Sequence, residues 1–151
     1  MSGPSFRFSL ERVRALRERA EDAAREALAG AIQDHHRTQV ATERAAQTVL
    51  DARDVQLEGT GVPVGAAELL ARQAYLEHSE RTHRASLDAL SGSEARVAQE
   101  RHTLTEAARD RQALERLKDN RRADFEREQA RLENLALDEI ALNNYRRREA
   151  A

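Results

Sequence analysis

Apolar residues recur along the first third of the chain at steps that alternate between four and three residues. A mean period of 3.5 residues is typical of a helix that packs along a partner helix in a left-handed supercoil. The pattern predicts one long helix over about residues 5–58. Most of its contact seam is alanine, which buries little area per residue and predicts a thin, modestly stable pair of helices. The predicted seam comprises Phe6, Leu10, Val13, Arg17, Ala20, Ala24, Ala27, Ala31, Asp34, Thr38, Ala41, Ala45, Thr48, Ala52 and Val55.

A second pattern predicts another helix over about residues 66–145. Its phase changes between Leu104 and Leu114, which predicts a local distortion of the coiled coil. Ser91-Gly92-Ser93 is a weak point inside this helix, because glycine costs about 1 kcal/mol in a helix interior. A complete break there would give a three-helix bundle instead. The predicted seam comprises Leu69, Leu76, His83, Leu87, Leu90, Val97 and Leu104, followed by Leu114, Phe125, Leu132, Leu135 and Leu142.

A cluster of helix-breaking residues separates the two patterns. Gly59, Gly61, Pro63 and Gly65 all lie within residues 59–65. Glycine and proline are the strongest local breakers of helices, and the flanking sequences contain few of them. The sequence therefore predicts an all-α fold and a single coiled-coil domain over residues 1–151. In it, two long helices reverse at residues 59–65 and pack antiparallel.

The two predicted helices differ in length, which leaves part of the second without a partner. At about 1.5 Å per residue, the first spans about 80 Å and covers the second only to about residue 118. Residues 119–151 should therefore project as a single helix. This segment still carries Phe125, Leu132, Leu135, Ile140 and Leu142. Because isolated helices gain most of their stability by packing an apolar face, we expect the segment to bind a partner.

Composition agrees with a long helical protein. Of the 151 residues, 34% are charged and 3% aromatic, and the net charge is -2. A near-neutral chain rich in Ala, Arg, Glu and Leu is typical of a coiled coil rather than of a disordered segment. The absence of cysteine excludes a disulfide framework. No apolar run approaches the ~18 residues of a membrane span, and the first residues lack the apolar core of a secretory signal. A soluble, cytosolic protein is expected.

Residues with candidate chemistry are few and poorly spaced. His35 and His36 are adjacent, and His78 and His83 are five residues apart, whereas helical zinc ligands lie four residues apart. Carboxylates on solvated helices lack the desolvated pocket that acid–base catalysis needs. The pI is near 6.2, and Tyr145 is the single aromatic residue beside the C-terminal basic cluster, which argues against nucleic-acid binding. The sequence predicts a protein that is not an enzyme and that has no metal site and no cofactor.

The two ends of the chain resemble the FliJ family, the coiled-coil component of the flagellar type III export apparatus. The N-terminal match is residues 6–17, Phe-Arg-Phe-Ser-Leu-Glu-Arg-Val-Arg-Ala-Leu-Arg. The C-terminal match is Glu128-Gln129, then Leu137-Asp138-Glu139-Ile140-Ala141, then Tyr145-Arg146-Arg147. Each motif is short, but both ends agree with the predicted architecture, so the resemblance covers nearly the whole chain.

The resemblance implies an antiparallel two-helix stalk that inserts into the hexameric ring of the flagellar export ATPase. It also implies contact with the cytoplasmic linker of the export gate, and handling of substrate chaperones. The protein would be cytoplasmic, peripheral at the membrane through the export apparatus, and monomeric when free. Matching by distance from the turn gives three gate-binding residues: Gln39, Leu50 and Tyr75.

The ring-binding residues are expected at the ends of the chain. Those near the N-terminus are Phe6, Phe8 and Leu10, and those in the unpaired segment are Leu135, Asp138, Glu139, Ile140, Ala141, Tyr145, Arg146 and Arg147. Leu135, Ile140 and Tyr145 are expected to form one apolar stripe, and the arginines to steer the end of the helix toward acidic loops. The alternative is a homo-oligomeric coiled-coil scaffold or adaptor, in which the unpaired segments of two copies pair with each other.

Overall fold

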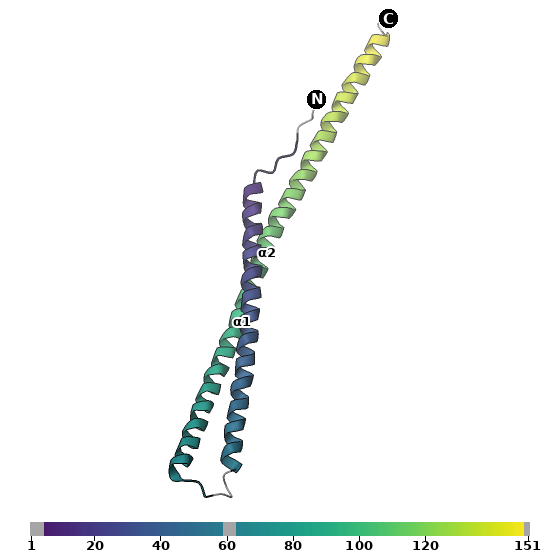
Figure 1. Cartoon of the computed structure of the whole chain (residues 1–151). Coiled ribbons are helices and arrows are strands. Elements are labelled where there is room, and N and C mark those ends of the chain that lie inside the picture. Colours follow the sequence, from purple (N-terminus) through teal and green to yellow (C-terminus); the bar gives the residue numbers. More distant parts are fainter. Residues whose placement is uncertain (1–4, 59–62, 150–151) are drawn as a thin grey trace. The chain divides into compact units, whose positions relative to one another are not determined.

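The computed structural model describes residues 5–58 and 63–149. This part of the chain consists of two helices without strands: α1, Glu11–Glu58, has 48 residues, and α2, Ala66–Glu149, has 84 residues (Figure 1). The helices pack against each other as a hairpin, which confirms the predicted all-α fold class. Gly59 and Gly61 of the predicted turn lie outside the described residues. Gly65 precedes α2, and its carbonyl accepts the first backbone hydrogen bonds of that helix, from Glu68 and Leu69.

The chain forms two compact units. The hairpin unit is Asp22–Glu106, and the terminal unit combines Met1–Glu21 with Ala107–Ala151. The prediction of a single domain therefore stays a prediction, and the two units are described separately below.

Contacts between the helices of the hairpin unit establish their direction. His35 Nδ1 lies 2.9 Å from Ser93 Oγ, and Thr42 Oγ1 donates to the carbonyl of Ser86 at 3.1 Å. The step of seven residues on α1 matches a step of seven in the opposite direction on α2. The helices are therefore antiparallel and keep the heptad register of a coiled coil.

The buried face of α1 follows the predicted period, but with half of its positions shifted by one residue. Ala24, Ala31, Thr38, Ala45 and Ala52 are buried or half-buried, as predicted. Among the predicted positions that alternate with them, Asp34 and Thr48 are half-buried, but the prediction was wrong for others, which are exposed: Ala20, Ala27, Ala41 and Val55. The residues that follow these alternate positions by one are all buried or half-buried. They are Glu21, Leu28, His35, Thr42, Val49 and Gln56.

The seam of α2 runs without a change of phase. Leu104, Ala107, Arg111 and Leu114 are all half-buried at steps of three, four and three residues, so the predicted slip is absent. The prediction for Leu87 was also wrong, since 45% of this residue is exposed, and Leu69 is exposed as well. The seam comprises Arg72, Leu76, Ser79, His83, Ser86, Leu90, Ser93, Val97, Glu100, Leu104, Ala107, Arg111, Leu114, Lys118 and Phe125.

The weak point at Ser91-Gly92-Ser93 does not interrupt α2. The Ser93 hydroxyl donates to the carbonyl of Leu90 at 2.7 Å, and it also meets His35 of α1. The contact between His35 and Ser93 thus supports α2 next to Gly92, its least favourable residue for a helix. The alternative three-helix bundle does not form.

The N-terminal residues differ from the prediction. α1 begins at Glu11 rather than near Ser5, and the described residues before it are not helical. Phe6 packs on Phe125 of α2 with ring centroids 5.8 Å apart, while Phe8 is 8% exposed beneath Arg121. In an extended chain, side chains two residues apart point to the same side, whereas in a helix they diverge by about 200°. Non-helical backbone lets both rings face α2.

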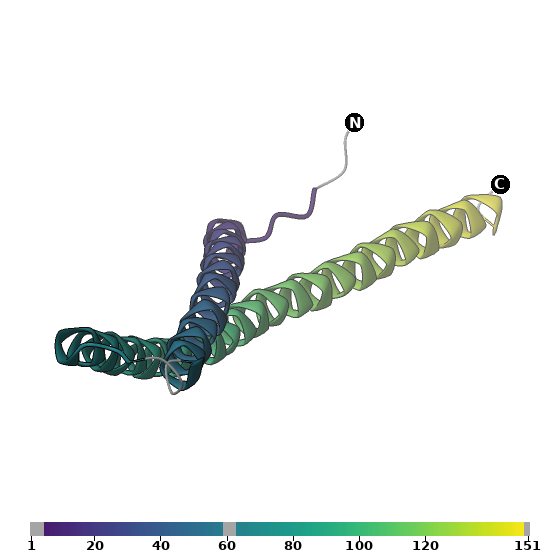
Figure 2. The ribbon, with the colours of Figure 1, turned by 60° about the horizontal axis from the view of Figure 1, so that its bottom comes forward.

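This N-terminal segment extends the contact along α2. A non-helical residue advances by up to about 3.3 Å, more than twice the rise of a helical one, so pairing reaches Phe125 rather than stopping near residue 118. The last half-buried residue of α2 is Gln129, and every described residue after it is exposed. Residues 130–149 are called the overhang below. In Figure 2 these final turns, coloured yellow-green to yellow, have no other described segment of the terminal unit beside them.

The revised seam makes a stability prediction. Val97 is 8% exposed and Leu87 45%. Val97→Ala should cost about 1.5–3 kcal/mol of unfolding free energy, since it removes buried methyl groups and leaves a cavity. Leu87→Ala should cost under about 1 kcal/mol. Urea denaturation followed by circular dichroism measures both. A larger loss for Leu87→Ala than for Val97→Ala would contradict this register.

Candidate partner-binding surfaces

The overhang exposes large apolar side chains that have no partner among the described residues. Leu137 is 63% exposed and Tyr145 61%, and Leu132, Leu135, Ile140 and Leu142 are each about half exposed. At about 100° per residue, Leu135, Leu142 and Tyr145 share one face, whereas Ile140 lies about 140° from Leu135. The expectation of one stripe through Leu135, Ile140 and Tyr145 was therefore wrong. Leu137 and Ile140 form a second apolar face on the other side of the helix.

Polar groups accompany these apolar faces. Asp138, Ala141, Leu142 and Tyr145 line a shallow hollow along one side of the helix. Glu139, Arg146 and Arg147 are exposed, and the structure describes no ion pair for them. Arg146, Arg147 and Arg148 occupy the last turn of α2, where positive charge is favoured by the helix dipole. The end of the overhang thus combines apolar surface with cations available to a partner.

The predicted ring-binding residues near the N-terminus lie against α2, before the overhang begins. Arg122 stands 5.8 Å from the ring centroid of Phe6, and Arg121 stands 5.9 Å from that of Phe8. Arg121 also donates to the Ser9 hydroxyl at 3.1 Å. Leu10 is half-buried. The structure does not bring these residues next to positions 135–147, and it engages both phenylalanine rings within the chain.

Ion pairs hold the rest of the terminal unit together. Glu21 is 3% exposed and pairs with Arg111, which also contacts Glu115 at 2.6 Å. Lys118 Nζ lies 2.8 Å from a carboxylate oxygen of Glu11. The hydrogen bond from Lys118 is the main cause that lowers the pKa of Glu11, followed by the one from Arg14. Likewise, the bonds to Glu21 and then Glu115 raise the pKa of Arg111. Charge replaces apolar contact along this part of the seam.

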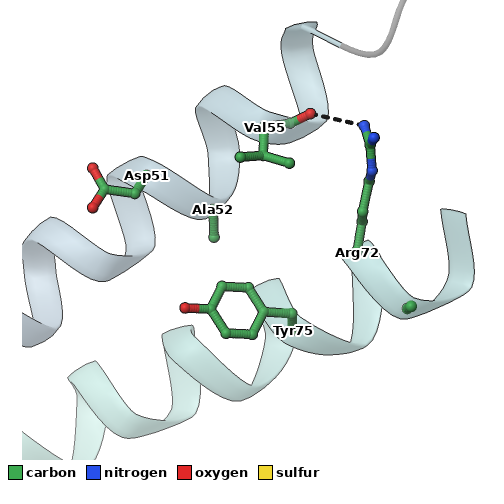
Figure 3. Close-up of a pocket in the computed structure, with 6 residues that line it drawn as sticks. Asp51, Ala52, Val55, Arg72 and Tyr75 are labelled. Atoms are coloured by element: carbon green, nitrogen blue, oxygen red, sulfur yellow. Dashed lines mark hydrogen bonds between the residues drawn. The ribbon is translucent and has the colours of Figure 1, made fainter. Parts of the chain in front are cut away.

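A groove lies between the helices of the hairpin unit, at the end where α1 finishes and α2 starts. It encloses about 370 Å³ and is lined by Asp51, Ala52, Val55, Ala71, Arg72 and Tyr75. Figure 3 shows the Tyr75 ring facing Ala52, and Arg72 reaching across to the backbone carbonyl of Val55 at 3.0 Å. The groove walls are therefore mostly apolar, with one charged group at each end.

The three predicted gate-binding residues do not share one face. Tyr75 lines the groove. Gln39 lies two heptads before Arg53, and Leu50 lies one heptad before Leu57, so each shares a side of α1 with its heptad partner. Arg53 and Leu57 line a different hollow, together with Leu69 and Leu76. Sequence reasoning placed Ala52 and Val55 in the seam, and it missed the groove that they line together with Ala71. Alanine is so common in this chain that its presence alone gave no signal.

Nowhere in residues 5–58 and 63–149 do three or more His, Asp or Glu side chains gather as a metal site. Neither α1 nor α2, as described, has a stretch apolar enough for a membrane span.

The family model described as the flagellar FliJ protein matches residues 6–150. No curated protein and no solved structure matches the chain.

The Glu11 contacts predict a pH dependence of stability. A carboxyl whose pKa is lowered by folding contributes stability above its ordinary pKa, and this contribution is lost as the pH falls through the lowered value. Glu11→Gln should therefore lower the melting temperature at pH 7, and the difference from the parent should shrink below about pH 4.5. Glu133→Gln, in the overhang, is the matched control and should have little effect. A difference for Glu11→Gln that stays constant down to about pH 2 would contradict the charge-based account.

Proposed function

The chain belongs to the flagellar FliJ protein family, and we propose that it acts as the stalk of the export ATPase. Membership in the family implies a role associated with flagellar protein export. In our proposal, the overhang inserts into the hexameric ATPase ring, and the hairpin unit contacts the cytoplasmic linker of the export gate. The chain itself carries out no chemistry and transmits contact between its two partners.

The distribution of apolar residues around the overhang supports insertion into a ring. A helix that docks side by side with one partner needs a single apolar stripe, whereas a helix with apolar side chains on several faces is typically enclosed. Leu135 and Leu142 occupy one face and Leu137 and Ile140 another, and all four are exposed. An opening bounded by several subunits buries both faces at once. This observation carries the proposal.

The contacts of the N-terminal residues suggest how the overhang is directed. Phe6 and Phe8 pack against the turns of α2 that precede it. The proposed role of Phe6, Phe8 and Leu10 is therefore to hold these turns of α2 in place. These three side chains would contact the ATPase hexamer only through the parts of them that remain exposed. Arg146 and Arg147 would attract acidic loops of the ring over a distance of about 8–10 Å at physiological salt.

The remaining partners follow from the family. We propose that the protein is cytoplasmic and peripheral at the membrane through the export apparatus, that it is monomeric when free, and that it handles substrate chaperones. Tyr75 is the predicted gate-binding residue with the clearest structural support, because it lines a groove. The homo-oligomeric scaffold remains the alternative function. It is less well supported, because pairing of two overhangs along one stripe leaves the other apolar face exposed.

Truncation tests the proposed function. A chain that ends at Asn134 loses most of the overhang but keeps all described contacts between α1 and α2. We expect its binding to the ATPase hexamer to be abolished, while circular dichroism and thermal unfolding show a folded hairpin. Full affinity of the truncated chain for the ring would contradict the proposal.

Point variants on the two faces of the overhang refine this test. Leu142→Asp and Ile140→Asp each place a charge on a different face, and Asn143→Asp adds the same charge at a polar position as a control. Enclosure predicts that the first two weaken ring binding by at least about tenfold and that the control changes it little. Loss in Leu142→Asp alone would indicate side-by-side docking instead.

A further inference from the structure

The groove at Tyr75 continues along the hairpin unit. A second hollow, lined by Ala45, Thr48, Tyr75, His78, Ser79 and Thr82, adjoins the first, and the Tyr75 side chain belongs to both. Ala45 and Ala52 lie seven residues apart on α1, which is two helical turns, or about 10 Å. The two hollows therefore lie in series on one side of the hairpin unit. The first is lined mainly by apolar side chains, and the second by both apolar and polar ones.

The dimensions of these pockets suit a helix. Alanines of α1 and α2 line the groove with small side chains. The Tyr75 ring, which is 55% exposed, lies between the two hollows. Side chains at positions i and i+7 of a third helix lie on one face, about 10 Å apart, and match this spacing. In the described part of the hairpin unit there is no strand whose edge could pair with an extended peptide.

Charge at the groove favours a cationic partner. Arg72 is already neutralised by Glu68 and bonded to Val55. Asp51, at the other end, receives a hydrogen bond from the Gln47 amide at 2.8 Å, and no cation pairs with it among the described residues. Residues 43–57 and 66–80 also carry more acids than bases, namely Glu43, Asp51, Asp54, Glu68, Glu77 and Glu80 against Arg44, Arg53 and Arg72.

We propose that this groove binds an amphipathic helix of a partner protein, with two apolar anchors two turns apart and a Lys or Arg beside them that pairs with Asp51. The inference rests on the proposed function, in which the hairpin unit contacts the export gate, and it specifies the chemistry of the segment that docks there. The anchors fill the pockets on either side of Tyr75. The acidic surroundings disfavour an acidic helix and an anionic membrane surface.

A model peptide tests the groove directly. The probe is a fluorescently labelled leucine–lysine peptide of about 14 residues with apolar positions at i, i+3, i+4 and i+7, compared with its leucine–glutamate counterpart. Fluorescence anisotropy with the full chain should show binding of the lysine peptide and at least about tenfold weaker binding of the glutamate peptide. Equal binding of the two peptides, or preference for the acidic one, would overturn the proposal.

Variants with matched controls locate the binding. Ala71→Trp fills the groove from an exposed helical position, and Ala74→Trp adds the same bulk outside it. Asp51→Asn removes the groove carboxylate, and Asp54→Asn removes a neighbouring one outside the lining. We expect Ala71→Trp to weaken lysine-peptide binding by about tenfold or more and Asp51→Asn to weaken it mainly at low salt, with both controls near the parent. Equal effects of Ala71→Trp and Ala74→Trp would contradict the site.

The same variants separate this inference from the proposed function. If the gate's cytoplasmic region binds Ala74→Trp but not Ala71→Trp, both stand. If it binds both variants equally, the gate contact stands and the groove proposal fails. If it binds neither the parent nor the variants while the lysine peptide still binds in the groove, the groove proposal stands and the gate assignment fails. Self-association of the full chain that is lost only in Ala71→Trp would assign the groove to a second copy and overturn the proposal.

Discussion

The unequal length of the two helices is the constraint on which the functional account depends. With 48 residues, α1 cannot cover the 84 residues of α2, even with the non-helical segment that precedes it. The last turns of α2 therefore carry apolar side chains that nothing in the described chain buries. Exposed apolar groups of this size are tolerated in a soluble protein when they form a binding surface. A partner with an enclosing shape removes both apolar faces of the overhang from water.

Polar contacts in the seam favour one register of α1 against α2. An alanine-rich seam buries little area and discriminates weakly between registers that differ by one heptad. In the observed register, His35 meets Ser93, Thr42 donates to the carbonyl of Ser86, and the buried Glu21 forms an ion pair with Arg111. Breaking a buried ion pair leaves an uncompensated charge, so a slipped hairpin is costly. These residues fix where α1 ends against α2, and thereby which residues remain in the overhang.

The sequence was sufficient to predict two helices, their antiparallel packing and an unpaired C-terminal end, because helix breakers and the 3.5-residue period are strong signals. The phase was harder to predict. Alanine favours helix at exposed and buried positions alike, so Ala20 and Ala27 resembled seam residues although Glu21 and Leu28 occupy the seam. The helix start was missed because Phe6 and Phe8 reach α2 only from non-helical backbone. The groove was missed because it arises from small side chains that leave space, for which the heptad pattern has no signal.

Site-specific photo-crosslinking shows whether the ATPase ring encloses the overhang. A benzoyl-phenylalanine residue at Leu137 or at Leu142 probes the two opposite faces of the overhang in the full chain mixed with the assembled export ATPase. Enclosure by the ring predicts crosslinks to the ATPase from both positions and none between copies of the chain. Crosslinks from both positions to a second copy of the chain, with none to the ATPase, would contradict the stalk and establish a homo-oligomeric coiled coil.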